Sequence, residues 1–389
     1  MMNHSTLSPL SSSQRSRRPW AWAQLATGLL LAVVSGILLF QRVEPFASEF
    51  YLFIWWSYII AIDAVTYLIQ NNSLIISRTR EFLIMLPWSV AFWLLFEMVN
   101  LRLDNWHYIN VASNIWVRWP GYFLAYATVL PGIFETAEVL GCLGLYHRVR
   151  CRQRVIAPVR FFAFYGTGIL FLALSLAAPR FCFPLIWLAF IFLLEPLNYT
   201  HGGLSLLRDW ELGKPKNLLL LLTAGLVCGG LWELWNFWAG AKWIYTVPFF
   251  DELKIFEMPL AGFLGFPPFA VECYVMYNFI SLFRGKRTWL KDNPPQTSYR
   301  RLSPRVTLSV AAVMILFFAI GFQVLDRHTV KSFALRPTLS TSKTPSAVLS
   351  RETGIIVTNS VPCIVCFADA QANQFWLESR KVLANNTRW

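Results

Sequence analysis

The side chains of this sequence best suited to chemistry are carboxylic acids that lie within apolar segments. They are Asp63, Glu97, Glu135, Glu138, Glu195, Glu233 and Glu272. A charged group inside a bilayer is costly, so acids placed there usually face the protein interior and carry a function. Apolar surroundings favour the protonated form of a carboxyl group, which can donate a proton. The expected chemistry is therefore acid catalysis or proton transfer.

All of these acids except Glu138 belong to an internal repeat. The first copy contains Asp63, Glu97, Asn100, Trp106, Tyr108 and Glu135. The second copy contains Glu195, Glu233, Asn236, Trp243, Tyr245 and Glu272. Matching residues are 132 positions apart at the start of the repeat, then 136, then 137. Because the separation changes in only two small steps, the pattern indicates a duplication with short loop insertions.

The composition of the chain indicates an integral membrane protein. Of its 389 residues, 56% are hydrophobic and 14% are charged, whereas about a quarter of the residues of a soluble protein are charged. We therefore expect an all-α polytopic membrane protein. About nine runs are long enough to cross roughly 30 Å of hydrocarbon. They are residues 20–40, 50–70, 82–100, 121–145, 159–178, 181–199, 217–238, 257–283 and 306–324.

Clusters of Arg and Lys determine the predicted orientation. They precede the first span and follow the second, fourth, sixth and eighth, so nine spans place every cluster on one side. The positive-inside rule then puts the N-terminus in the cytoplasm and the C-terminal tail outside. This clustering accounts for the net charge of +13, and nucleic acid is not an expected partner. The predicted location is the bacterial inner membrane, with the first span as a signal anchor.

This orientation predicts two parallel three-helix repeats. Spans 2–4 and spans 6–8 both start outside and end inside, so a pseudo-twofold axis along the membrane normal relates them and span 5 joins them. The predicted segments are the N-terminus with the first span (1–49), repeat 1 (50–145), a basic loop with span 5 (146–180), repeat 2 (181–283), a basic loop with span 9 (284–324) and a polar extracytoplasmic tail (325–389).

Helical spacing groups the acids with their neighbours. Glu97 with Asn100, and Glu233 with Asn236, are i,i+3 pairs that share one helix face. Each repeat supplies a predicted triad of catalytic carboxylates: Asp63, Glu97 and Glu135, and Glu195, Glu233 and Glu272. Candidates for substrate binding are Asn100, Asn236, Trp106, Tyr108, Trp232, Trp235, Trp243 and Tyr245. The alternative interpretation is structural, with neutral acids joining helices and an aromatic belt at the membrane interface.

Three motifs of the second repeat resemble the integral-membrane lycopene cyclase domain of carotenoid synthesis. They are Trp232-Glu233-x-Trp235, Gly240-x-Lys242-Trp243-x-Tyr245 and Gly262-x-x-Gly265-x-Pro267-Pro268-x-x-x-Glu272. The resemblance covers about 230 residues. It implies two three-helix units joined by one helix, an apolar isoprenoid substrate, and protonation of an olefin by a carboxylic acid before ring closure. The acid would be Glu272 or Glu135, supported by Glu233 and Glu97. The family's double glutamate is replaced here by Val271-Glu272 and Phe134-Glu135.

Other functions stay open from the sequence. Tandem repeats with intramembrane acids also suit a proton-coupled transporter, and a non-catalytic scaffold that uses the tail as its contact surface is a third alternative. We expect membrane lipids as partners, and neither a metal nor a cofactor, because no metal-binding spacing or nucleotide-binding motif occurs. Cys363-x-x-Cys366 in the tail favours a disulfide or an unpaired structural role over zinc.

Overall fold

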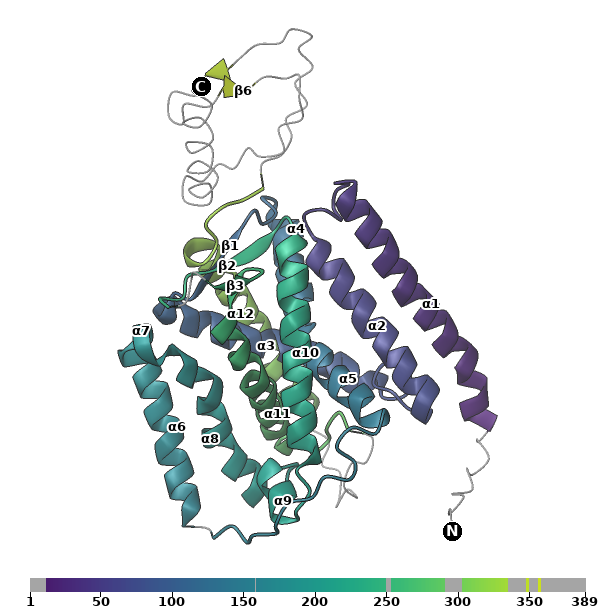
Figure 1. Cartoon of the computed structure of the whole chain (residues 1–389), viewed down its shortest axis with the longest axis vertical. Helices are drawn as coiled ribbons and strands as arrows, with labels where there is room; N and C mark the ends of the chain where they lie inside the picture. The colour runs from purple at the N-terminus through teal and green to yellow at the C-terminus, as the bar shows by residue number, and fades with distance from the viewer. Residues whose placement is uncertain are drawn as a thin grey trace.

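The computed structural model is a bundle of long apolar helices (Figure 1). It describes residues 12–157, 159–249, 253–290 and 303–334, together with two short strands at 348–349 and 356–357. In this part of the chain, nine helical stretches are long and apolar enough to cross a membrane, as predicted. They are 17–40, 50–70, 79–103, 115–142, 160–177, 179–200, 216–238, 260–282 and 304–328. The tail motif Cys363-x-x-Cys366 lies outside the described residues.

The helices and strands that build the bundle fall into two consecutive halves and an appended helix. The first half contains α1 (Ser12–Phe40), α2 (Phe50–Gln70), α3 (Thr79–Leu103), β1 (Trp106–Ile109), α4 (Ile115–Tyr126) and α5 (Val129–Cys142). The second half contains α6 (Arg160–Ala177), α7 (Pro179–Cys182), η1 (Phe183–Leu185), α8 (Ile186–Thr200), α9 (Leu206–Glu211), α10 (Lys216–Trp238), β2 (Lys242–Tyr245), β3 (Lys254–Ile255), β4 (Met258–Pro259), η2 (Leu260–Gly265) and α11 (Phe266–Leu282). Helix α12 (Pro304–His328) follows them, and β5 (Val348–Leu349) and β6 (Ile356–Val357) form a separate pair.

The helices pack in a similar way in the two halves. In the first half, α1 packs against α2, and α5 packs against both α2 and α3. In the second half, α6 packs against α8, and α11 packs against both α8 and α10. Helix α10 also packs against α5, so the two halves share one hydrophobic core. Figure 1 shows α1 with α2 on one flank of the bundle and α6 with α8 on the other.

The contacts of α1 and α6 show a correspondence that the predicted repeats did not include. Gly28 of α1 meets the backbone of Ser57 and Ala61 on α2, whereas Gly168 of α6 meets Ala189 and Leu193 on α8. These contacted residues are 132 positions apart, the separation already found for the repeat. Glycine at such crossings allows two helix backbones to approach closely. Helices α1 and α6 therefore cross α2 and α8 at residues that are 132 positions apart.

Two short strands join the halves at one end of the bundle. Strand β1 pairs antiparallel with β2, with Trp106 opposite Tyr245 and Tyr108 opposite Trp243. In the repeat, Trp106 matches Trp243 and Tyr108 matches Tyr245. Trp106 therefore faces the counterpart of Tyr108, and Tyr108 faces the counterpart of Trp106. A local twofold axis between the two strands produces this exchange.

The residues after α12 complete this strand layer. Residues predicted to begin a polar tail at 325 instead continue α12 to His328. Val330 then pairs with Tyr108 on the free edge of β1, and Phe333 pairs with Val111 just after that strand. Asp326 fixes α12 in place, because Arg118 donates to it from Nε and Nη2, both at 2.8 Å. The part of the tail nearest the membrane thus belongs to the folded domain.

Candidate functional site

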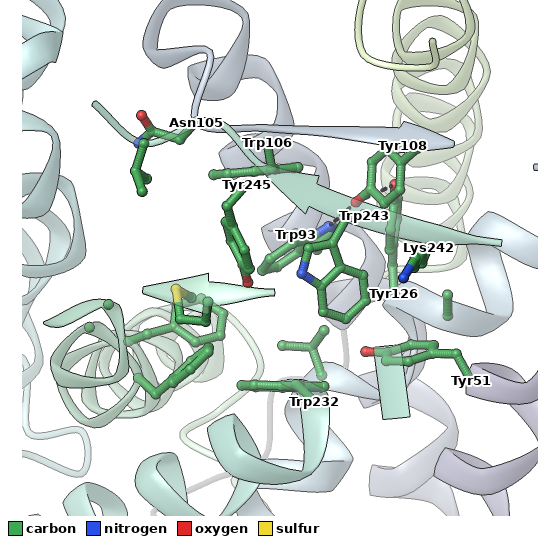
Figure 2. A pocket seen from close by; sticks show the side chains of 18 of the residues that line it. Tyr51, Trp93, Asn105, Trp106, Tyr108, Tyr126, Trp232, Lys242, Trp243 and Tyr245 are labelled. Atoms are coloured by element: carbon green, nitrogen blue, oxygen red, sulfur yellow. Dashed lines mark hydrogen bonds between the residues drawn. The ribbon is translucent and has the colours of Figure 1, made fainter. Parts of the chain in front are cut away.

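A cavity of about 630 Å³ lies below the β1–β2 pair, between the two halves (Figure 2). Its walls are mostly apolar and rich in aromatic rings, and they come from α2, α3, β1 and α4 on one side and from α8, α10, β2, η2 and α11 on the other. Five of the predicted site residues line this cavity, and four of them form the matched pairs Trp106 with Trp243 and Tyr108 with Tyr245. Trp106, Tyr108, Trp232, Trp243 and Tyr245 line it, together with Tyr51, Trp93, Tyr126, Trp187 and Phe269.

Glu97 lies directly behind the cavity wall of the first half. Its side chain is fully buried, and its Oε1 accepts hydrogen bonds from Tyr108 Oη at 2.5 Å, Trp93 Nε1 at 2.9 Å and Trp106 Nε1 at 3.1 Å. All three donors line the cavity. The Tyr126 hydroxyl donates to the Tyr108 hydroxyl at 3.3 Å, which extends the chain of hydrogen bonds along the wall. The acid is therefore connected to the cavity through a tyrosine.

Glu233 has the equivalent position in the second half but fewer partners. It is fully buried, and its Oε1 accepts a hydrogen bond from Tyr245 Oη at 2.8 Å. Its Oε2 has no hydrogen-bond partner. The Nε1 of Trp243, the counterpart of Trp106, is likewise buried without a partner. Glu97 Oε2 is likewise without a partner, so the two acids share this feature and the tyrosine contact, and they differ in the indole donors from Trp93 and Trp106 on Glu97.

The two tyrosines act as hydrogen-bond donors at neutral pH. Burial raises the pKa of Tyr108 and of Tyr245 well above the usual range, and the neighbouring glutamate acts in the same direction. Both phenols therefore keep their protons and donate to the carboxyl groups behind them. Each tyrosine stands between an acid and the cavity, where it can pass a proton from one to the other.

The two asparagines hold the strands that carry these tyrosines. Asn100 Nδ2 donates to the Trp106 carbonyl at 2.8 Å, and Asn236 Nδ2 donates to the Trp243 carbonyl at 2.9 Å. Each Oδ1 accepts a backbone N–H in return, from Asn105 or from Trp243. Both were predicted to bind substrate. The structure instead gives them a positioning role, because neither asparagine lines the cavity.

Asp63 and Glu195 bind loops rather than the cavity. Asp63 accepts from Ser73 Oγ at 3.0 Å and from the Ile75 N–H at 2.7 Å. Glu195 accepts from Ser205 Oγ at 2.6 Å and from the Leu207 N–H at 3.0 Å. In each case the donors lie ten and twelve residues further along the chain. These acids therefore fix the turn that follows α2 or α8, and they do not line the cavity.

Glu135 and Glu272, the acids suggested by the family resemblance, are fully buried away from the cavity lining. Glu135 interacts electrostatically with Asp63 and Glu138, and Glu138 forms an ion pair with Arg78 at 2.6 Å. Glu272 accepts a hydrogen bond from the Phe190 N–H at 2.9 Å. The structure thus joins Asp63 with Glu135, but it gives Glu97 and Glu233 separate partners on the cavity wall.

The aromatic predictions divide in the same way. Trp235 does not line the cavity and packs against Trp55, with ring centroids 4.7 Å apart. Tyr51 and Tyr126 line the cavity but were not predicted. Neither is preserved as tyrosine at the matching position of the other copy, so the repeat gave no signal for them.

Metals and known relatives add no further assignment. In residues 12–157, 159–249, 253–290 and 303–334, no group of three or more His, Cys, Asp or Glu side chains is placed to hold a metal ion. Comparison of the chain with family profiles, curated proteins and solved structures finds no match. The functional argument therefore depends on the geometry of the cavity and its acids.

Proposed function

We propose that this protein is a membrane enzyme that takes an apolar, isoprenoid-like lipid into the aromatic cavity and acts on it by acid catalysis, as a cyclase or isomerase. The observation that supports this most directly is the pair of buried acids, Glu97 and Glu233, each hydrogen-bonded to a tyrosine that lines the cavity. Asp326 also accepts a hydrogen bond from a cavity-lining tyrosine, Tyr122, but it is not fully buried and forms an ion pair with Arg118. The proposal therefore moves the acid role from Glu135 and Glu272 to Glu97 and Glu233.

The cavity suits an apolar ligand in size and composition. A volume of about 630 Å³ falls within the roughly 300–1,000 Å³ of small-molecule sites. Phe181 and Leu264 line it and are 69% and 76% exposed on the outside of the bundle. Large apolar side chains that are exposed on a membrane-spanning bundle face lipid, so a substrate can enter the cavity from the bilayer.

The proposed chemistry needs only a proton and an apolar wall. A proton leaves the acid–tyrosine pair and forms a C–H bond with one carbon of an olefin, which leaves a carbocation on the other. The faces of surrounding tryptophan and tyrosine rings stabilise that positive charge. Ring closure or migration of the double bond follows, and loss of a proton from a neighbouring carbon to the carboxylate restores the acid. No net oxidation or reduction takes place.

The proposed architecture is a tandem duplication of four-helix units. Helices α1, α2, α3 and α5 form one unit, and α6, α8, α10 and α11 form the other, because α1 and α6 make equivalent contacts. Four spans return the chain to its starting side, so parallel copies need no additional connecting helix. With basic clusters inside, the N-terminus lies in the cytoplasm, and the cavity opens toward the outer half of the bacterial inner membrane.

A deuterium-labelling experiment tests this function. The purified protein in lipid nanodiscs is incubated in D₂O with lycopene as a linear polyene, and with the lipids that co-purify, and products are analysed by mass spectrometry. Acid catalysis puts one solvent deuterium on carbon. We expect Glu97→Gln or Glu233→Gln to reduce labelling about 10²–10⁴-fold, the usual contribution of a general acid.

A second tyrosine–glutamate pair provides the control. Tyr199 Oη donates to Glu211 at 2.8 Å, away from the cavity lining. Tyr199→Phe and Glu211→Gln should leave labelling unchanged, whereas Tyr245→Phe should reduce it. Lipid that binds and never acquires deuterium would refute catalysis and favour the transporter alternative.

A further inference from the structure

Two pairs of matched positions in the cavity lining carry residues of opposite polarity. Glu49 of the first half matches Phe181 of the second half, 132 positions further along the chain. Tyr51 matches Phe183 at the same separation, and all four residues line the cavity. A duplication with unchanged side chains would give the cavity two equal ends. These two differences instead make the contribution of the first half polar and that of the second half apolar.

Glu49, Tyr51 and Lys242 lie together at one end of the cavity, which we call the polar end. The two residues before Glu49 accept backbone hydrogen bonds from Gly240 and Ala241, both at 2.9 Å, so the start of α2 lies beside the start of β2. Lys242 is the first residue of β2 and lines the cavity. Figure 2 shows Lys242 and Tyr51 on the same side of the cavity, with the Tyr51 hydroxyl turned toward its middle.

Phenyl rings form the opposite end, which we call the apolar end. Asn105 directly precedes β1, and the antiparallel register places it at the far end of the strand pair from Lys242, as Figure 2 shows. The Asn105 carbonyl accepts a hydrogen bond from the Thr246 N–H at 2.8 Å. Three residues later, Phe249 packs against Phe181 with ring centroids 5.8 Å apart. The apolar end therefore coincides with the lipid-exposed side of the cavity.

The two basic side chains that line the cavity in the described part of the chain are already paired with acids. Lys242 Nζ lies 2.6 Å from Glu257 Oε1. Arg118 Nη2 lies 2.8 Å from Asp326 Oδ2. An anionic end group on a ligand, such as a phosphate, would have to compete with one of these carboxylates. The charges at the polar end therefore favour an uncharged polar group.

Glu49 is the only carboxylic acid in the cavity lining among the described residues. Its side chain is partly buried, makes no capping hydrogen bond to α2 and forms no ion pair within the described part of the chain. Burial raises the pKa of this carboxyl group, and the neighbouring Glu44 acts in the same direction. Because a carboxyl group accepts hydrogen bonds in both protonation states, Glu49 can accept one from a hydroxyl group in the cavity.

Building on the proposed function, we propose that the substrate is an amphipathic isoprenoid alcohol, whose hydroxyl donates to Glu49 and accepts from Tyr51 while its chain extends toward Phe181. A hydroxyl group has one donor and two acceptor lone pairs, which match a carboxyl oxygen and a phenol. Glu49 is then a residue that determines specificity. Its contact fixes which double bond of the chain lies beside the tyrosines bound to Glu97 and Glu233.

Binding of four probes that differ only in their terminal group tests this site. The full-length protein in nanodiscs is titrated with all-trans-retinol, retinyl methyl ether, axerophthene and retinyl phosphate, and binding is followed by retinoid fluorescence. We expect retinol to bind about 10- to 100-fold more tightly than axerophthene, which lacks the hydroxyl, as two hydrogen bonds provide. The methyl ether keeps the acceptor and loses the donor, so its affinity should lie between them. Retinyl phosphate should bind less tightly than retinol.

Matched variants separate the hydroxyl contact from general effects on packing. Glu49→Leu should lower the retinol-to-axerophthene affinity ratio about 3- to 10-fold, the contribution of one hydrogen bond, and Glu49→Gln, which keeps an acceptor, should lower it less. Glu44→Gln should leave the ratio unchanged, because Glu44 binds Ser48 and does not line the cavity. Phe181→Leu, at the position that matches Glu49, should change the affinities for both probes by the same factor.

The outcomes distinguish this proposal from the function on which it rests. Equal binding of retinol and axerophthene, equal binding of retinol and its methyl ether, or tighter binding of retinyl phosphate than of retinol would overturn the hydroxyl site and leave the apolar cavity standing. An unchanged ratio in Glu49→Leu, or an equal fall in Phe181→Leu, would do the same. Absence of binding by all four probes would overturn both proposals.

Discussion

Alanine at Gly28 tests whether α1 belongs to the repeated unit. A Cβ atom at Gly28 would lie 2.9 Å from the Ala61 nitrogen and 2.9 Å from the Ser57 oxygen, both backbone atoms of α2. Because carbon contacts are favourable at about 3.5–4.0 Å, the helices must separate by roughly half an ångström. Such overpacking costs about 1–3 kcal/mol, and alanine returns about 0.5–1 kcal/mol of helix propensity. Gly28→Ala should therefore lower the unfolding free energy by about 0.5–2 kcal/mol.

Three other glycines provide the comparison. Gly36 and Gly166 have nothing within 4 Å of an added Cβ, so their alanine variants should be as stable as the native protein or more stable. Gly168→Ala should fall between, because its nearest neighbour at 2.7 Å is the movable side chain of Leu193, although the Ala189 oxygen lies 3.0 Å away. The assay is unfolding in mixed micelles with increasing SDS. Equal stability of Gly28→Ala and Gly36→Ala would refute the close α1–α2 contact. A gain for Gly168→Ala equal to that of Gly166→Ala would refute the correspondence of α1 with α6.

Two further predictions concern groups outside the cavity chemistry. Asp326→Ala should lower the unfolding free energy by about 3–5 kcal/mol, because it leaves the buried Arg118 without its ion pair and removes the acceptor of Trp119 and Tyr122. The loss for Asp326→Asn should be smaller. A loss below about 1 kcal/mol for Asp326→Ala, typical of exposed pairs, would contradict this prediction. Asp209, in the short helix α9, has its pKa raised above 3.8 by burial, so the native state binds its proton more tightly than the unfolded state. Its contribution to stability is complete below pH 3.8 and is lost as the pH rises through the raised value. Asp209→Asn should therefore exceed the native protein in stability at neutral pH, by a margin that shrinks on acidification, and a margin independent of pH would contradict the assignment.

The acids and the membrane spans that carry them could be predicted from the sequence, but the side chains that surround each acid could not. The repeat identified Glu97 and Glu233, and hydropathy identified nine membrane-length helices. Ser73 and Ser205 are also 132 residues apart, so the loop-binding role of Asp63 and Glu195 was visible in principle. The match of Gly28 with Gly168 was harder to detect, because its separation of 140 residues differs from that of α2 and α8.

The cavity itself could not be derived from one sequence. It depends on the pairing of β1 with β2 across the two halves and on long-range packing of α10 against α5. Neither contact leaves a periodic signal, because periodicity reports which face of an element is buried and not which partner covers it. Tyr126 is an example. Its position in α4 is compatible with a ring that faces lipid and with a ring in the core, and only the folded structure places its hydroxyl beside that of Tyr108.

The two halves differ most around the acids, and the first half also contacts a segment that has no counterpart in the second half. Helix α12 and residues 329–334 contact the first half through α3, Asp326 and the outer edge of β1. That half also satisfies its acid completely at Oε1, with three donors on Glu97. In the second half, Glu233 lies behind the cavity wall with one donor, Tyr245, within hydrogen-bond distance of its Oε1, and Oε2 has no partner on either acid. A duplicated pair of acids in identical surroundings would give two equivalent sites. Different surroundings instead give two acids held by different numbers of hydrogen-bond donors, which is the condition for assigning them different roles.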